Sequence, residues 1–326
     1  MSENQHEISN SRNKEFTFWD CLCYLLLSLW FIVHNILDFI IDKIFSFFYD
    51  DTKQGKIPTV THSFLMESAS SLAERIRNKE ISAVEVVEGF VERIKQVNPL
   101  INAVVCDRFE LALKEAVEAD ELIGSGKLTK EQLQQQKPFL GIPFTTKDST
   151  AAKGLLHTLG LVSRRNTKAT EDADAVVLMK EAGAILLGTT NIPELNMWCE
   201  TRNNVFGQTL NPYNTTRTVG GSSGGEASII AANGSPLGLA SDIGGSIRMP
   251  AFYCGIFGHK PTSGLTPMKG FTRRTGKEEK TMVTAGPMCR YAQDLAPFLK
   301  VMIGNNISKL NLDKQVNMYK TWFSLY

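Results

Sequence analysis

The chain has 326 residues, 43% of them hydrophobic, and its 35 basic and 34 acidic side chains give a formal net charge of +1. This is the composition of a globular protein with room for a large core. The balanced charges form no basic stripe, so we do not expect nucleic acid as a partner.

The N-terminal region departs from this average. The segment 21–37, CLCYLLLSLWFIVHNIL, has no charged residue and continues into the largely apolar FIIDKIFSFF. Because a membrane span needs about 20 apolar residues, we expect residues 16–48 to form a membrane anchor after a polar tail at 1–15. An amphipathic helix lying in the interface is the alternative, and a signal peptide fits less well because no small-residue cleavage site follows.

Six cysteines are spread along the chain without the spacing of a disulfide framework or of a zinc finger. We interpret them as reduced, buried thiols and expect no metal site. They are Cys21, Cys23, Cys106, Cys199, Cys254 and Cys289.

Helical patterns follow a polar linker at 49–63. Apolar residues recur at helical spacing over 64–79, and a second helix starts at Ser82, a capping serine with a glutamate three residues later. A third helix is expected over 108–123. The glutamine-rich stretch 127–138 is expected to be a solvated helix or loop.

From residue 140 onward, short apolar runs alternate with helical segments. This alternation is typical of an α/β fold around a mainly parallel or mixed sheet. The expected strands are 140–146, 184–190 and 236–241, and the expected helices are 172–184 and 224–233.

The stretch 219–228, VGGSSGGEAS, is rich in glycine and serine. A phosphate-binding loop is disfavoured because Glu226 stands where that motif needs a lysine. GGSSG from Gly220 matches the Gly-x-Ser-x-Gly pattern of a nucleophile elbow, but no apolar strand precedes it and only His259 follows. A Ser-His-Asp triad is therefore a weak interpretation.

A lysine base is the remaining interpretation. Lys147 follows the apolar run GIPFTT, and burial there would favour the neutral amine. A second cluster at 241–250, SDIGGSIRMP, offers successive unhindered amides and Ser246, the residue at which a helix could begin. Taken alone, Lys147 would more often be a surface lysine at a strand end.

Three blocks of sequence resemble the amidase signature serine hydrolases. They are GIPFTTKDS, VGGSSGGEASII and GLASDIGGSIRMPAFYCGIFGHKPT. The resemblance extends over residues 64–310 and implies an α/β amidase-signature fold, in which helices flank a mixed central sheet.

The same resemblance implies a Ser-Ser-Lys triad and no cofactor. Ser246 would be the nucleophile, Lys147 the general base and Ser222 the proton relay between them. Gly221 would precede Ser222 through a cis peptide bond, and Ser223 would support the network. The implied oxyanion hole consists of four backbone amides, those of Ile243, Gly244, Gly245 and Ser246.

Glu226 and the DIGGS motif resemble the branch of the family that hydrolyses lipid amides, whereas members that amidate tRNA lack an apolar anchor. We therefore expect an amidase at an intracellular membrane that cleaves fatty-acid amides, and the resemblance is compatible with a homodimer. Met197 and Trp198 are candidates for an acyl pocket, with core packing as the alternative.

The family continues well beyond residue 326, so we expect the amidase domain at 64–310 to be incomplete and 311–326 to be a divergent tail. Truncation would expose sheet edges and remove part of the core. The alternative function is therefore an inactive, membrane-bound homologue with a binding or regulatory role.

Overall fold

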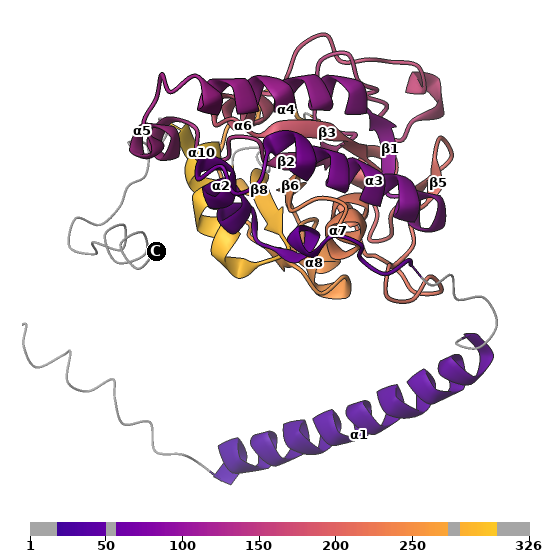
Figure 1. Ribbon diagram of the computed structural model, residues 1–326. Coiled ribbons are helices and arrows are strands. Elements are labelled where there is room, and N and C mark those ends of the chain that lie inside the picture. Colours follow the sequence, from indigo (N-terminus) through magenta and orange to yellow (C-terminus); the bar gives the residue numbers. More distant parts are fainter. Residues whose placement is uncertain (1–17, 50–56, 273–280, 305–326) are drawn as a thin grey trace, which may run out of the picture. The chain divides into compact units, whose positions relative to one another are not determined.

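The computed structural model describes residues 18–49, 57–272 and 281–304. They belong to two compact units, a long helix and an α/β unit (Figure 1). Helix α1 (Phe18–Tyr49) is long and apolar enough over Phe18–Phe48 to cross a membrane, and none of its most apolar stretch is buried in the protein. The expected tails at 1–15 and 311–326 lie outside the described residues.

The α/β unit is built on a six-stranded mixed sheet in the order β1-β3-β2-β6-β8-β7. The three central strands β3, β2 and β6 are parallel, whereas β1, β8 and β7 each run antiparallel to a neighbour. The strands are β1 (Val104–Asp107), β2 (Pro143–Lys147), β3 (Ile185–Thr190), β6 (Leu237–Asp242), β7 (Phe257–Gly258) and β8 (Thr284–Cys289). The predicted α/β fold with a mixed sheet is confirmed.

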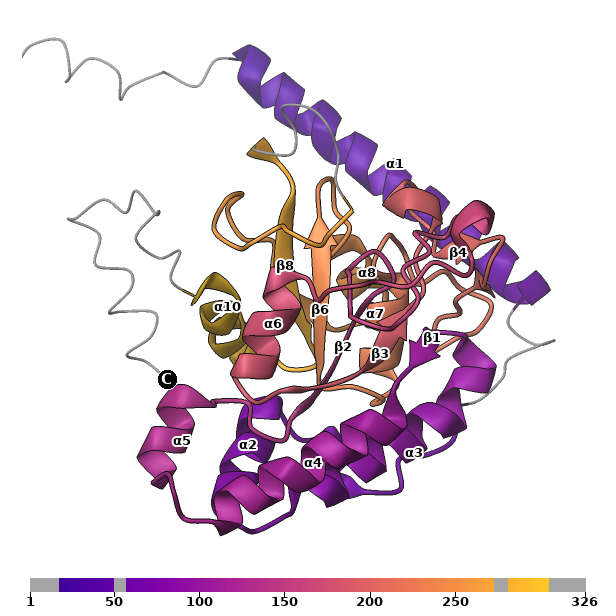
Figure 2. The ribbon, with the colours of Figure 1, turned by 90° about the horizontal axis from the view of Figure 1, so that it is seen from above.

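Helices cover both faces of this sheet (Figure 2). Helix α6 (Asp174–Glu181) connects β2 to β3, and α7 (Gly224–Ala231) connects β3 to β6, in the opposite direction along the sheet. Because such connections are right-handed, they place α6 and α7 on opposite faces. Helix α10 (Leu295–Ile303) packs beside α6, and α3 (Ala83–Ile101) packs on α7.

Shorter elements complete the unit. Among the described residues there are also helices α2 (Ala69–Arg77), α4 (Phe109–Gly124), α5 (Lys130–Gln136) and α8 (Arg248–Tyr253), and a separate ribbon pairs β4 (Arg202–Asn203) with β5 (Gly207–Gln208). The single turns of 3₁₀ helix in this part of the chain are η1 (Ser63–Met66), η2 (Val162–Arg164), η3 (Glu194–Asn196) and η4 (Ala292–Asp294).

The continuous helix expected over 64–79 is wrong, because the chain is interrupted after η1. Glu67 is extended, and Ser68 is the N-cap of α2, where its side chain accepts a hydrogen bond from the Ser71 amide. A capping serine begins a new helix at this point. Ser82 caps α3 in the predicted way, by accepting from the Glu85 amide.

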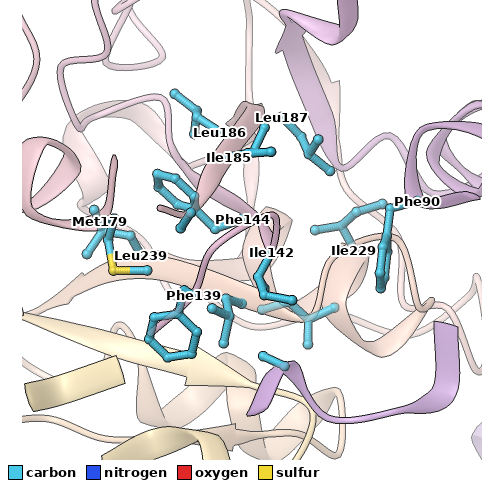
Figure 3. Packing of buried hydrophobic residues seen from close by; sticks show 14 of the residues in the cluster. Phe90, Phe139, Ile142, Phe144, Met179, Ile185, Leu186, Leu187, Ile229 and Leu239 are labelled. Carbon is cyan, nitrogen blue, oxygen red and sulfur yellow. The ribbon is translucent and has the colours of Figure 1, made fainter. Parts of the chain in front are cut away.

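The core lies between the sheet and its helices. Every residue of β2 and β3 is buried, as expected for central strands with helices on both faces. Figure 3 shows part of this core, in which Phe144 of β2, Leu239 of β6, Phe90 of α3 and Ile229 of α7 are all fully buried.

The expectation of buried thiols is correct for two cysteines. Cys254 and Cys289 are buried, and burial raises the pKa of Cys254 to about 12. It is wrong for Cys21, Cys23 and Cys199, which are exposed because the first two lie on the surface of α1 and the third lies in a surface loop. All six are free thiols.

Candidate active site

The site is built at the carboxyl ends of the parallel strands. Lys147 is the last residue of β2 and pairs in register with Thr190, the last residue of β3. Ser241 and Asp242 end the neighbouring strand β6. Parallel strands bring these side chains to one edge of the sheet, where open α/β sheets bind their ligands.

The glycine-serine loop enters this edge just before α7. The Gly221–Ser222 peptide bond is cis. A Cβ atom at Gly221 would lie 2.5 Å from the carbonyl oxygen of Trp198, and one at Gly225 would lie 2.6 Å from that of Asn191. Glycine is required here because neighbouring segments approach too closely for a side chain.

Lys147 and Ser222 are in direct contact. The Lys147 Nζ donates a hydrogen bond of 2.8 Å to the Ser222 Oγ and lies 3.5 Å from the Ser241 Oγ. Lys147 and Ser222 are both fully buried. The structure therefore brings together two of the three predicted triad residues in an environment that disfavours a charged amine.

Ser246 lies in the tight loop that follows β6, and Asp242 organises this loop. The Asp242 carboxylate accepts hydrogen bonds from the amides of Gly245 at 2.8 Å and Ile247 at 2.9 Å, and it forms an ion pair with Arg248. Burial alone would raise the pKa of Asp242, but the hydrogen bonds from Arg248 and from the two amides lower it below its usual value. The carboxylate thus stays charged although it is buried.

The predicted oxyanion-hole amides are not equivalent. The Gly245 amide already donates to Asp242, whereas the amides of Ile243, Gly244 and Ser246 have no hydrogen-bond acceptor among the described residues. Helix α8 begins at Arg248 rather than at Ser246, because the Asp242 contacts hold the intervening residues in the loop.

Ser246 borders two hollows. A cavity of about 30 Å³ is lined by Ser222, Ser241, Ser246 and Asn196, among others. A wider, open hollow of about 360 Å³ is also lined by Ser246, and Met197 and Trp198 line it with 60% and 63% of their surfaces exposed.

Met197 and Trp198 are therefore exposed residues and do not belong to the core. The exposed His259 lines neither hollow, which removes the alternative histidine base. Ser223 joins the two loops, since its amide donates to the Ser246 carbonyl oxygen at 3.1 Å.

Glu226 was missed as a site residue by sequence reasoning. It is fully buried on the first turn of α7, and its carboxyl oxygens lie 2.7 Å and 2.8 Å from the hydroxyls of Thr145 and Thr190. Burial raises its pKa to about 8, against the opposing effects of the two threonines and Lys147. The available signal was an acidic residue inside an otherwise small and apolar helix.

Ser241 and Asn196 were missed as well, because nothing in their local sequence indicates proximity to Lys147 or Ser246. Within the described part of the chain, no group of three or more His, Cys, Asp or Glu side chains could hold a metal ion.

The chain is similar to known proteins in both sequence and fold. The amidase family model matches residues 85–322. The chain is 46% identical over 281 residues to fatty-acid amide hydrolase 2-A of Danio rerio, covering 86% of this chain and 53% of that protein. It is 48% identical over 260 residues to fatty-acid amide hydrolase 2 of Homo sapiens, covering 79% and 49%.

A solved structure of fatty acid amide hydrolase has a TM-score of 0.68 at 30% identity, and the match covers 80% of this chain and 43% of that one. The chain thus spans about half the length of the curated relatives it matches. From the family model, the identities and the shared fold, the chain belongs to the amidase signature family.

Proposed function

We propose that this chain is an amide hydrolase in which Lys147, Ser222 and Ser246 form a proton relay. The observation that carries the proposal is the buried 2.8 Å hydrogen bond between Lys147 Nζ and Ser222 Oγ, beside a cavity that Ser246 also lines. A neutral lysine can accept a proton, and a serine hydroxyl needs such a base to become a nucleophile.

The relay accounts for both halves of the acylation step. As the Ser246 Oγ forms a bond to the amide carbonyl carbon, its proton passes to Ser222, and the Ser222 proton passes to Lys147. The same path in reverse protonates the amine nitrogen as the carbon–nitrogen bond breaks. Water then hydrolyses the acyl ester. Amide cleavage requires this return of the proton, because an amine anion is a poor leaving group.

The loop after β6 supplies the electrostatic part of the mechanism. The amides of Ile243, Gly244 and Ser246, which lack a protein acceptor, would donate to the oxyanion of the tetrahedral intermediate. The Gly245 amide instead holds the loop in shape through Asp242.

A fatty-acid amide is the proposed substrate. Three observations support it: the names of the relatives, the apolar lining of the open hollow by Met197, Trp198 and Met249, and the apolar helix α1. Long-chain amides partition into bilayers, and an anchored enzyme would meet them there. We place the protein at an intracellular membrane.

A fluorophosphonate probe tests the nucleophile and the base on the full chain in detergent. We expect wild-type labelling that is lost in Ser246→Ala and slowed at least about 100-fold in Lys147→Met, since general-base catalysis contributes 10²–10⁴-fold. The control is Lys153→Met, which removes an exposed lysine close in sequence.

Failure of the folded wild-type protein to react would instead support the inactive homologue. Substrate class needs a second comparison, between oleoyl amide and a short aryl amide. Preference for the short amide would refute the lipid assignment and leave the amidase assignment intact.

A further inference from the structure

The carboxyl group of Glu226 occupies a cradle formed by three strands. Thr145 of β2 and Thr190 of β3 contact its two oxygens, at 2.7 Å and 2.8 Å. On β6 the facing residue is Gly238, at which a Cβ atom would lie 2.3 Å from the Glu226 Oε2. The site therefore fits a carboxyl group closely. It is adjacent to Lys147, because Thr190 on β3 pairs with Lys147 on β2.

Two hydroxyl groups contact this carboxyl group, that of Thr145 at Oε2 and that of Thr190 at Oε1. The Thr190 Oγ1 lies 2.8 Å from the Glu226 Oε1 and 3.3 Å from the carbonyl oxygen of Thr146. A hydroxyl has one proton and a carbonyl can only accept. The cradle therefore accommodates both forms of the carboxyl group: Thr190 donates to a carboxylate, or it donates to Thr146 and accepts from a protonated acid.

A charged Lys147 would lower the pKa of Glu226, against the larger raising effect of burial. A carboxyl group and an amine that share one proton can exist as an ion pair or as a neutral pair. Full burial favours the neutral pair, because two charges would have to be removed from water. Of the other titratable side chains on elements packed against α7, Arg93 of α3 donates to a backbone carbonyl, Asp242 of β6 pairs with Arg248 of α8, and Cys289 of β8 is a buried thiol. The rest are exposed and are Glu85, Glu88, Glu92 and Lys95 of α3 and Tyr253 of α8.

We propose that Glu226 is a positioning residue held as an uncharged carboxylic acid, which keeps the shared proton and leaves Lys147 as a neutral amine. This proposal rests on the proposed role of Lys147 as the base. In the ion pair the same proton would sit on Lys147, and the relay would have no acceptor. Glu226 thus acts on the reaction through Lys147 and does not touch the substrate.

Infrared spectroscopy of the full chain in detergent, with ¹³C-labelled glutamate, tests the location of the proton. At pH 7 we expect a carbonyl band of a protonated glutamic acid that is absent in Glu226→Gln and present in Glu88→Gln, an exposed control on α3. In the wild-type protein the band should disappear as the pH rises through about 8. Labelling only glutamate separates this band from those of buried aspartates.

Two stability profiles give an independent measurement. When Glu226→Gln unfolds, Lys147 takes up a proton. The equilibrium constant for unfolding of this variant, relative to that of wild type, should therefore fall about tenfold for each unit by which the pH rises. Unfolding of Lys147→Met releases a proton from Glu226, so its constant should rise about tenfold per pH unit between about pH 5 and pH 8.

Absence of the band in the wild-type protein, or its persistence in Glu226→Gln, would overturn the proposal, as would flat profiles in both variants. Neither readout depends on turnover. A protein that shows the band but never labels at Ser246 would refute the proposed function alone.

Discussion

The Asp242 carboxylate accepts hydrogen bonds from three backbone amides and two guanidinium nitrogens within the next six residues. Such a concentration of donors fixes the turn between β6 and α8, and with it the position of Ser246. The neighbouring residues Ile243 and Gly244 line the wider hollow. One buried carboxylate therefore prepares both the proposed nucleophile and the proposed oxyanion hole.

We expect Asp242→Asn to slow fluorophosphonate labelling of Ser246 by about 10- to 100-fold, because an amide cannot accept from all these donors and small displacements of reacting groups are costly. Asp172→Asn, which removes a partly buried ion pair with Lys180, is the control. Labelling of Asp242→Asn at the wild-type rate would contradict the organising role.

The stabilisation that the Asp242 carboxylate gives to this loop depends on pH, and the direction follows from its pKa. The folded-state pKa of Asp242 lies below its ordinary value of 3.8. A lowered pKa means that the stabilisation is complete above that ordinary value and is lost as the pH falls through the folded-state value. The loop should therefore keep its geometry throughout the neutral and mildly acidic range.

At the scale of elements, the beginnings of helices α2 and α3 depend on distant carboxylates. Asp294, at the end of η4, accepts hydrogen bonds of 2.9 Å from the amides of both Ala69 and Ser70. Asp120 of α4 accepts from the first two amides of α3 in the same way. Amides at a helix start lack partners within the helix, so these bonds join segments far apart in sequence.

We expect Asp294→Ala to lower the free energy of unfolding by about 2 kcal/mol or more, because it leaves buried amides without acceptors. Asp120→Ala should cost about 1 kcal/mol, since water can reach the partly exposed start of α3. Urea unfolding followed by circular dichroism measures both. Equal losses would show that burial of the cap makes no difference.

Sequence periodicity predicted the helices and strands that are determined by residues close together in the sequence. The strands ending at Lys147 and Thr190 and the helix at 224–233 are present, because strongly apolar runs bounded by glycine and polar residues leave few alternatives. The break at Ser68 was missed because the apolar spacing continues across it. Short β7 and antiparallel β8 were missed because their pairing depends on contacts distant in sequence.

The candidate site likewise contains residues that the sequence could predict and residues that it could not. Lys147, Ser222 and Ser246 could be proposed because small-residue loops and a lysine after an apolar strand are visible in the sequence. The role of Glu226 could not, because it follows from three strands that place Thr145, Thr190 and Gly238 around one carboxyl group. No local pattern encodes that arrangement.

At the scale of the whole molecule, the apolar surface is divided unevenly between the two units. The α/β unit has a continuous core of buried apolar side chains, among them Phe90, Phe144 and Leu239. In helix α1, large apolar residues such as Leu29, Ile36 and Phe45 keep about half of their surface exposed. Exposure to water costs roughly 25 cal/mol per Å² of apolar surface, so this helix needs an apolar environment outside the described contacts.

Val33 lies near the middle of α1, and a charge there distinguishes a spanning helix from one in the interface. We expect the wild-type chain to resist alkaline carbonate extraction and Val33→Asp to be largely extracted, because a central aspartate costs about 2.5–3.5 kcal/mol. The matched control is Val117→Asp, at a half-exposed position of α4, which should extract like wild type. A wild-type chain released by carbonate would contradict the spanning anchor and favour the interfacial helix, whose apolar face enters the bilayer only in part.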